Sequence, residues 1–394
     1  MKIAMIGPSY PFRGGIAQHT TLLYRHLRRE HEVSFYGFKR QYPAWLFPGK
    51  TDRDNSKQPL TEPGIEYLLD SMNPWSWFQV FRRICAEQPE VVIIPWWTFF
   101  WTPQFLTLAS LLKTVSKSRL LFICHNVFDH DSRFLSRFCA KAVLPLGDHF
   151  VVHSEEDLNR LSALVGVEKI TLGFLPLFEW DDSPTLSPVD AKHHLGLEGD
   201  VLLFFGFIRP YKGVPDLLQA LRFIVRERKV TLLLVGESWD TEDSLARQIQ
   251  ELELGEHIKR IEGYVPNEEM GLYFSAADLV VLPYISGTGS GVVQNAFAFD
   301  RPVIGTRVGS LPQTVDHGRT GYLVEPGDHQ ALAEAVLRFF REGKAEEFKA
   351  NIRVEKKKFE WDRLVQVLEQ AVIETPTNLQ PTIVADTEYN RRQA

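Results

Sequence analysis

Cysteine is scarce in this 394-residue chain. The three cysteines, Cys85, Cys124 and Cys139, are odd in number and have no Cys-x-x-Cys spacing. That pattern argues against a disulfide framework and against a zinc site, and it is typical of a protein kept in a reducing compartment. The N-terminus lacks the apolar run of a signal peptide, and residues 2–7 predict a strand instead. We therefore expect a cytoplasmic protein, either free or peripheral at the inner face of the membrane.

One segment without charge, residues 91–112, is long enough on paper to span a bilayer. Pro95 and Pro103 interrupt it, whereas a spanning helix must satisfy its backbone polar groups internally. We expect a buried strand, an aromatic loop and an amphipathic helix. Tryptophans in that loop either stack on a sugar ring, enter a membrane interface or, as is more common, pack in the core. They are Trp96, Trp97 and Trp101.

The chain as a whole has no excess of basic residues, and its formal charge is −6. Residues 1–175 carry 20 Lys and Arg against 16 Asp and Glu, whereas residues 176–394 carry 24 against 34. The acidic second half and the lack of a basic stripe argue against nucleic-acid binding. The mildly basic first half fits either an anionic acceptor or membrane surface, or merely a solvated surface.

The length is too great for one ordinary core, and 44% hydrophobic with 24% charged residues is typical of a globular protein. Strands alternate with helices in two successive sets, which predicts two doubly wound parallel-sheet α/β domains facing each other across a cleft. The expected units are domains at 1–175 and 201–360, a Pro-rich linker at 176–200, a helix at 361–374 and a disordered polar tail at 375–394.

A glycine-rich stretch dominates the second half. Gly287, Gly289 and Gly291 follow the apolar strand predicted at 278–283 and precede a short helix at 292–299. Such a strand, turn and helix N-terminus favour an anion, because backbone N–H groups and the helix dipole point at it. The alternative is a tight turn in which the glycines only ease packing. Two cations, Arg209 and Lys212, follow the strand predicted at 201–205, and together with the helix N-terminus they suit a diphosphate.

The first half holds weaker signals. Gly14 and Gly15 precede a helix predicted at 20–29 and repeat the anion-site pattern, although they form no GxGxxG motif and a plain turn is the alternative. His125 follows the strand predicted at 120–124, where open α/β sheets bind ligands, and a core or helix-cap histidine is its alternative. The unpatterned residues 39–64 predict a long mobile loop.

Ser154 and Asn267 are expected first of all to cap helices.

Several short segments of the chain match the pattern of a known family. The second half resembles the retaining family-4 (group 1) glycosyltransferases of the GT-B fold, which move a sugar from a nucleotide donor. The matching pieces are 206–213 (GFIRPYKG), 263–266 (GYVP), 277–283 (ADLVVLP), 302–306 (PVIGT), 318–324 (GRTGYLV) and 359–362 (FEWD). Looser matches in the first half are 14–15 (GG), 125–126 (HN) and 151–154 (VVHS).

The resemblance implies a role for each candidate residue. Arg209 and Lys212 would hold the donor diphosphate and stabilise the leaving group, and His125 would lie near the sugar hydroxyls or the acceptor. The acceptor would be a glycan or lipid-linked glycan met by the first domain, while the second domain binds the nucleotide sugar. No metal cluster or cofactor is expected, because protein cations and helix dipoles take an ion's place. The remaining donor contacts would be Gly14, Gly15, Gly236, Tyr264, Val265, Ser290, Gly291, Val292 and Asn295.

The sequence departs from the family at one pair of positions. The family usually places two glutamates eight residues apart around its glycine-rich loop, and here Gly287 and Asn295 take their places. Asn295 can still hydrogen-bond a ribose hydroxyl, although without the added strength of a charge. A divergent subgroup is therefore expected, and a non-catalytic sugar-nucleotide-binding subunit of a glycan assembly complex is the rival hypothesis. An epimerase or a phosphorylase on a similar two-domain fold is a weaker alternative, and a phosphorylase would need a pyridoxal-phosphate lysine motif that the sequence lacks.

Overall fold

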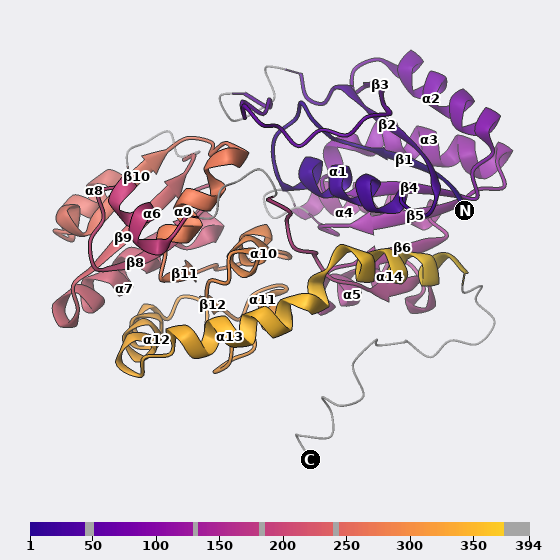
Figure 1. Cartoon of the computed structure of the whole chain (residues 1–394). Helices are drawn as coiled ribbons and strands as arrows, with labels where there is room; N and C mark the ends of the chain where they lie inside the picture. The colour runs from indigo at the N-terminus through magenta and orange to yellow at the C-terminus, as the bar shows by residue number, and fades with distance from the viewer. Residues whose placement is uncertain (44–50, 129–132, 181–185, 239–243, 374–394) are drawn as a thin grey trace.

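Two parallel β-sheets, each covered by helices, stand side by side in the computed structural model (Figure 1), which describes residues 1–43, 51–128, 133–180, 186–238 and 244–373. This arrangement confirms the predicted fold class. The first sheet has the order β3-β2-β1-β4-β5-β6-β7 and the second has β10-β9-β8-β11-β12-β13. In both, the order reverses beside the first strand of the sheet, and such switch points are where open α/β sheets bind ligands.

The strands of the first sheet are β1 (Lys2–Gly7), β2 (Glu32–Arg40), β3 (Ile65–Asp70), β4 (Val91–Trp96), β5 (Arg119–Cys124), β6 (His149–Val152) and β7 (Ile170–Leu172). Those of the second are β8 (Asp200–Phe205), β9 (Val230–Gly236), β10 (Ile258–Glu262), β11 (Leu279–Leu282), β12 (Val303–Thr306) and β13 (Gly321–Val324). The central strands β4 and β11 are buried along their whole length, as continuous apolar runs in parallel sheets must be.

Helices cover both faces of the first sheet. The helices α2 (Pro74–Glu87), α3 (Thr102–Val115) and α4 (Arg133–Val143) pack side by side on one face, followed by α5 (Glu155–Ser162). On the other face α1 (Gly15–Leu27) packs beside the last helix, α14 (Trp361–Ile373). The C-terminal helix therefore returns from the second domain to complete the core of the first, as Figure 1 shows.

The second sheet is covered by α6 (Pro188–His194), α7 (Val214–Glu227), α8 (Ser244–Glu251), α9 (Met270–Ala276), α10 (Gly291–Ala298), α11 (Leu311–Thr314), α12 (His329–Arg341) and α13 (Ala345–Glu355). Short 3₁₀ turns are η1 (Phe99–Trp101), η2 (Leu144–Leu146), η3 (Val167–Lys169), η4 (Pro210–Lys212), η5 (Gly255–His257), η6 (Asn267–Glu269) and η7 (Lys356–Phe359). The glycine-rich loop of the second domain leads from β11 into α10.

Several local predictions need correction. The loop predicted at 39–64 holds the end of β2, and its described residues 51–54 hydrogen-bond to the loop after β1, with Arg13 N–H donating to the Asp52 carbonyl. Neither β3 nor α4 was predicted from the sequence, and the linker predicted at 176–200 contains the helix α6. Asn267 caps no helix, because its side chain accepts a hydrogen bond from Gln18. Ser154 does cap α5, since its Oγ accepts from the Asp157 N–H at 3.1 Å.

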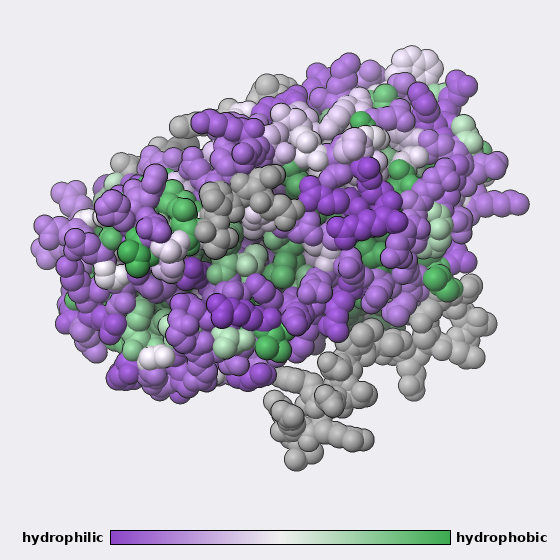
Figure 2. Space-filling view, viewed as in Figure 1, coloured by the Kyte–Doolittle hydropathy of each residue, from purple (hydrophilic) through white to green (hydrophobic). Residues whose placement is uncertain are grey.

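The charge-free segment folds as expected, into β4, η1 and α3. Its three tryptophans are buried, so of the alternatives given for them, packing in the core is the one that the structure shows. Among the described residues no helix is both long and apolar enough to cross a membrane. The surface in view is mostly hydrophilic, with apolar residues near the boundary of the two domains (Figure 2). The predicted tail at 375–394 lies outside the described residues.

Candidate functional site

A cavity of about 260 Å³ lies between the two domains, at the carboxyl ends of both sheets. The loops after β1, β8, β9 and β11 all contribute to it. Nine of the predicted donor contacts and cations line it: Gly14, Gly15, Lys212, Gly236, Tyr264, Val265, Gly291, Val292 and Asn295. The volume is near the lower end for a small-molecule site. The structure therefore brings together residues that the sequence separates by up to 281 positions.

Two helix N-termini meet at this cavity, one from each domain. Gly14 is the N-cap of α1 and has φ of 104°, a conformation that favours glycine, and space beyond its Cα is open. Gly291 is the first residue of α10, and a Cβ there would lie 3.0 Å from the Phe178 ring. Backbone N–H groups and positive dipole ends thus face the same space from opposite sides, which favours an anion.

Lys212 supplies a cation at the same place. Its Nζ lies 3.7 Å from the centre of the Tyr284 ring, and burial together with the like charge of Arg209 lowers its pKa to about 8. The next residue, Gly213, has φ of 68°, and a Cβ there would meet the Pro283 carbonyl oxygen at 1.8 Å. Only glycine fits that turn, so the backbone itself fixes Lys212 against the strand end.

A buried ion pair joins the domains at the edge of the cavity. Arg13 Nη1 lies 2.8 Å from Glu237 Oε2, and both side chains are less than a tenth exposed. The Arg13 guanidinium also lies 5.0 Å from the centre of the Tyr264 ring, and Tyr264 hydrogen-bonds to the Gly14 backbone. Burial raises the pKa of Tyr264, so its phenol is neutral. This pair was not predicted from the sequence.

Further hydrogen bonds hold the cavity closed. Gln18 Nε2 donates to Asn267 Oδ1 at 2.9 Å, the Asn267 N–H donates to Ser56 Oγ at 2.9 Å, and the Lys57 N–H donates to Glu268 Oε1 at 2.9 Å. Each of these bonds joins the first domain to η6 of the second. The described part of the loop predicted at 39–64 therefore contacts the second domain beside the site.

Sequence families match both domains. The family described as Glycosyltransferase Family 4 matches residues 13–172, and the one described as Glycosyl transferases group 1 matches residues 199–342. The chain belongs to these glycosyltransferases. Among relatives, a D-inositol 3-phosphate glycosyltransferase of Pseudarthrobacter chlorophenolicus is 30% identical over 52% of this chain and 47% of its own length. The O-antigen chain mannosyltransferase B of Escherichia coli is 30% identical over 44% and 46%.

This glycosyltransferase chain spans about half the length of the curated relatives it matches. Solved structures share its fold over a greater length. A sucrose-phosphate synthase from Thermosynechococcus elongatus has a TM-score of 0.70 at 21% identity, covering 95% of this chain and 99% of that one. The HepE protein of Anabaena, solved with UDP, has a TM-score of 0.73 at 18% identity, covering 95% and 100%.

At the family's two glutamate positions this glycosyltransferase has a distinct arrangement. Asn295 Oδ1 accepts a hydrogen bond from Trp180 Nε1 at 3.1 Å, and Trp180 packs 6.0 Å from Phe178. Both aromatic residues line the cavity and come from the linker. Near Gly287, Thr288 Oγ1 donates to the His125 carbonyl at 3.2 Å and also bonds Asn126 Oδ1. The Thr288 hydroxyl thus contacts the first domain instead of the cavity.

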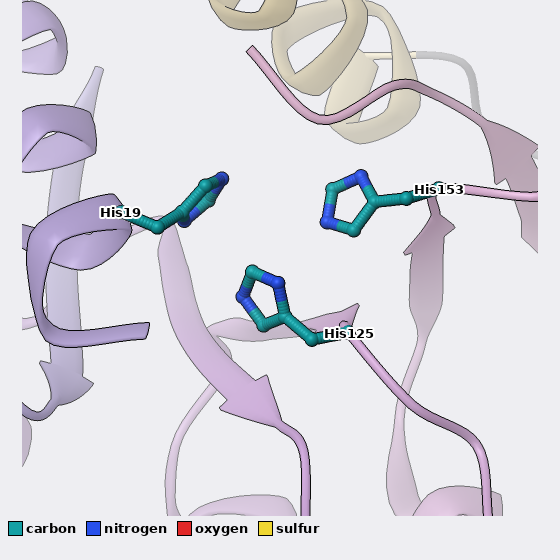
Figure 3. A group of neighbouring side chains, drawn as sticks. All are labelled: His19, His125 and His153. Carbon is teal, nitrogen blue, oxygen red and sulfur yellow. The ribbon is translucent and has the colours of Figure 1, made fainter. Parts of the chain in front are cut away.

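Three predicted residues of this glycosyltransferase lie outside the cavity lining. Arg209 lies just before η4, close enough to Lys212 to lower its pKa. Ser290 is buried as the N-cap of α10, with its Oγ 3.1 Å from the Tyr284 hydroxyl. His125 is not among the residues that line the cavity, and its ring lies beside those of two other histidines, His19 and His153 (Figure 3). Its predicted contact with the sugar or the acceptor stays a prediction.

Some cavity residues could have been found from the sequence and others not. Glu237 directly follows the predicted contact Gly236, so its place beyond a strand end was a usable signal. Arg13 directly precedes the Gly14-Gly15 pair and carried the same signal. Trp180 and Phe178 stand in a proline-rich linker, where no periodic pattern marks them.

Proposed function

We propose that this chain transfers a sugar from a nucleoside-diphosphate sugar to a glycan or lipid-linked acceptor. One observation carries the proposal: the two helix N-termini and Lys212 converge on a single cavity between the domains. A diphosphate there would meet backbone N–H groups from both domains and a fixed ammonium group. Such a preorganised positive site stabilises the charge that develops on a leaving nucleotide.

Residues of both domains would contact the donor diphosphate at one end of the cavity. Lys212 and Arg209 would neutralise the diphosphate, and Gly291 and Val292 would donate backbone N–H groups to it, with Ser290 setting the start of α10. Gly14 and Gly15 would close over the phosphates from the first domain. The chemistry assigned to these groups needs no divalent ion, since fixed cations and dipoles do the neutralising.

The nucleoside would occupy the other end. Tyr264 and Val265 offer an apolar wall to the base, and Gly236 leaves room for the ribose. Because Asn295 Oδ1 already accepts from Trp180, its amide N–H₂ is the group left to donate to a ribose hydroxyl. The solved HepE structures with UDP and UDP-glucose make uridine nucleotides the first donors to try.

Retention of the anomeric configuration and a role in surface polysaccharide or glycolipid synthesis complete the proposal. Retention follows from the resemblance to retaining enzymes. The synthetic role draws on the named relative that is an O-antigen chain mannosyltransferase. His125 would act indirectly, because its carbonyl and the neighbouring Asn126 hold Thr288 of the glycine-rich loop in place.

The deciding experiment screens purified protein against UDP-, GDP- and ADP-sugars by thermal shift and nucleotide release. Stabilisation by one donor, with slow release of its nucleotide, is the expected result. Stabilisation without release, even with lipid extract added, would favour the rival function of a sugar-nucleotide-binding subunit. Gly287 and Asn295, in place of the usual glutamates, are the residues that favour this rival. No stabilisation by any donor would reject the assignment of the cavity.

We also propose a cytoplasmic location with peripheral contact at an anionic membrane. On the outer surface of the first domain, α2 and α4 flank α3 and expose large aromatic side chains. Phe134 and Phe138 on α4 are 90% and 68% exposed, and Trp75 on α2 is 75% exposed. Basic residues accompany them, and this combination suits anionic lipid headgroups. The exposed basic residues are Arg82, Arg83, Arg137 and Lys141.

Vesicle sedimentation tests this contact. The protein should bind vesicles rich in phosphatidylglycerol and bind phosphatidylcholine vesicles weakly. The double variant Phe134→Ser/Phe138→Ser should lose most of that binding, whereas Val354→Ser, which alters an exposed apolar residue of the second domain, should not. Equal binding by both variants would refute the proposed face.

A further inference from the structure

Three histidines from distant parts of the first domain share one buried space. His19 comes from α1, His125 follows β5, and His153 follows β6. Figure 3 shows their rings arranged around a common centre. The ring centroids of His19 and His125 are 4.6 Å apart, those of His125 and His153 are 5.0 Å apart, and those of His19 and His153 are 5.8 Å apart. One nitrogen from each ring lies within 4.8 Å of the others.

These imidazoles are buried, and much of their hydrogen-bonding capacity is unused. All three residues are less than a tenth exposed. Within the described ranges, neither ring nitrogen of His19 nor Nε2 of His125 has a hydrogen-bond partner. Buried polar groups are almost always paired, so such a cluster calls for an explanation. Burial, and for two of them the neighbouring histidines, lowers the pKa of each ring below its ordinary value, so the imidazoles are neutral.

We propose that His19, His125 and His153 bind one transition-metal ion of the Zn²⁺ class. Neutral imidazole nitrogen suits zinc, copper, iron and nickel, and three histidines with one open position are a common zinc arrangement. A Zn–N bond of about 2.0–2.1 Å requires nitrogens about 3.4 Å apart, so the rings need to move inward by roughly 1 Å. Hard cations such as Mg²⁺ prefer oxygen ligands and are not expected here.

The position of the site links it to both domains. The Trp361 ring of α14 lies 5.2 Å from the His19 ring, and Trp361 Nε1 donates to the Leu177 carbonyl at 2.8 Å. His125 bonds Thr288 of the glycine-rich loop through its carbonyl oxygen. An ion held by the three rings would therefore fix α1, two strand ends and the contact with the second domain together. It lies outside the lining of the donor cavity, so this inference does not depend on the proposed function.

Metal binding is measured directly, without an activity assay. Purified full-length protein is stripped with a chelator, titrated with Zn²⁺ and Co²⁺, and followed by equilibrium dialysis with metal analysis, visible absorption and thermal melting. The expected result is one ion per chain, the visible bands of four-coordinate Co²⁺, and a higher melting temperature with Zn²⁺.

The variants His153→Gln and His19→Gln should each weaken Zn²⁺ binding at least about tenfold, since each removes one ligand of three. His149→Gln is the matched control, because this half-buried histidine stands at the other end of β6 and bonds Thr171. Its affinity should equal that of the unaltered protein. Melting curves without metal show whether each variant folds. No stoichiometric ion on the unaltered protein, or undiminished affinity in both ligand variants, would overturn the site.

Discussion

Arg13 and Lys212 occupy comparable places in the two domains, yet they are held differently. Each follows the first strand of its sheet, Arg13 by six residues after β1 and Lys212 by seven after β8. Arg13 is paired with Glu237 across the domain boundary. Lys212 faces aromatic rings, and in the described part of the chain no carboxylate pairs with it. One cation therefore joins the domains, while the other remains available to an anionic ligand.

The strongest test of this contrast is removal of the available cation. Lys212→Ala should lower the turnover number about a hundred- to a thousandfold, the usual loss when one preorganised charge-stabilising group is removed. The melting temperature should hold or rise, because burying the ammonium costs free energy in the unliganded protein. Steady-state nucleotide release and melting curves measure the two effects. Lys229→Ala, on the surface, is the control, and turnover within twofold of normal in Lys212→Ala would remove Lys212 from the site.

Breaking the other cation's pair should instead affect stability. Glu237→Ala leaves the Arg13 charge buried without its main partner, and such losses cost about 3–5 kcal/mol of unfolding free energy. The double variant Arg13→Met/Glu237→Ala should recover a large part of the lost unfolding free energy, because no uncompensated charge remains. Urea unfolding measures both. Glu334→Ala breaks the exposed pair with Arg341 and should cost less than about 1 kcal/mol. If Glu237→Ala loses no more unfolding free energy than Glu334→Ala, the structural role of Arg13 is contradicted.

The pH dependence of nucleotide binding sharpens the contrast further. The pKa of Lys212 is about 8 without ligand, and a bound diphosphate favours the protonated form. Affinity should therefore be full below pH 8 and fall at higher pH, by at most about tenfold per unit, since binding then takes up a proton. Calorimetric titration with the cognate nucleoside diphosphate between pH 7 and 9.5 measures this. Lys212→Arg stays charged and should show a flat profile, whereas equal affinity of the normal protein at both ends would exclude the lysine.

Most elements of the second domain could be predicted because its strands are short apolar runs between turn residues. The strand β11 is buried throughout, so its sequence carries no polar interruption. The edge strand β3, IEYLLD, is only partly buried and mixes charged with apolar residues, which hides it. On α4, Phe134 and Phe138 are exposed, so its apolar pattern does not mark the face that packs.

The site could be predicted as far as strand ends go. Gly14 and Lys212 follow strands and Gly236 ends one, and parallel sheets bring such ends to one edge. The Arg13–Glu237 pair joins residues 224 positions apart, and the histidine cluster joins three separate segments. Neither leaves a spacing in the sequence, because each depends on how the chain folds back. The expectation of no metal cluster followed from the cysteine spacing and from the family resemblance, and neither of these brings the three histidines together.

The smallest expected effect concerns Asn295, at the proposed ribose end of the cavity. Asn295→Glu restores the carboxylate that the family usually has, and Trp180 Nε1 would still have an oxygen to donate to. The ribose hydroxyl, which in our proposal accepts from the amide N–H₂ of Asn295, would instead donate to the carboxylate of the glutamate. A hydrogen bond to a charged acceptor contributes about 1 kcal/mol more than a neutral one, so donor affinity should rise about fivefold. Calorimetry with the same nucleotide measures it, with Asn295→Asp as a shorter control. Weaker binding would indicate that the ribose hydroxyl is oriented to accept and not to donate, so that Trp180 and Asn295 act together in place of the glutamate.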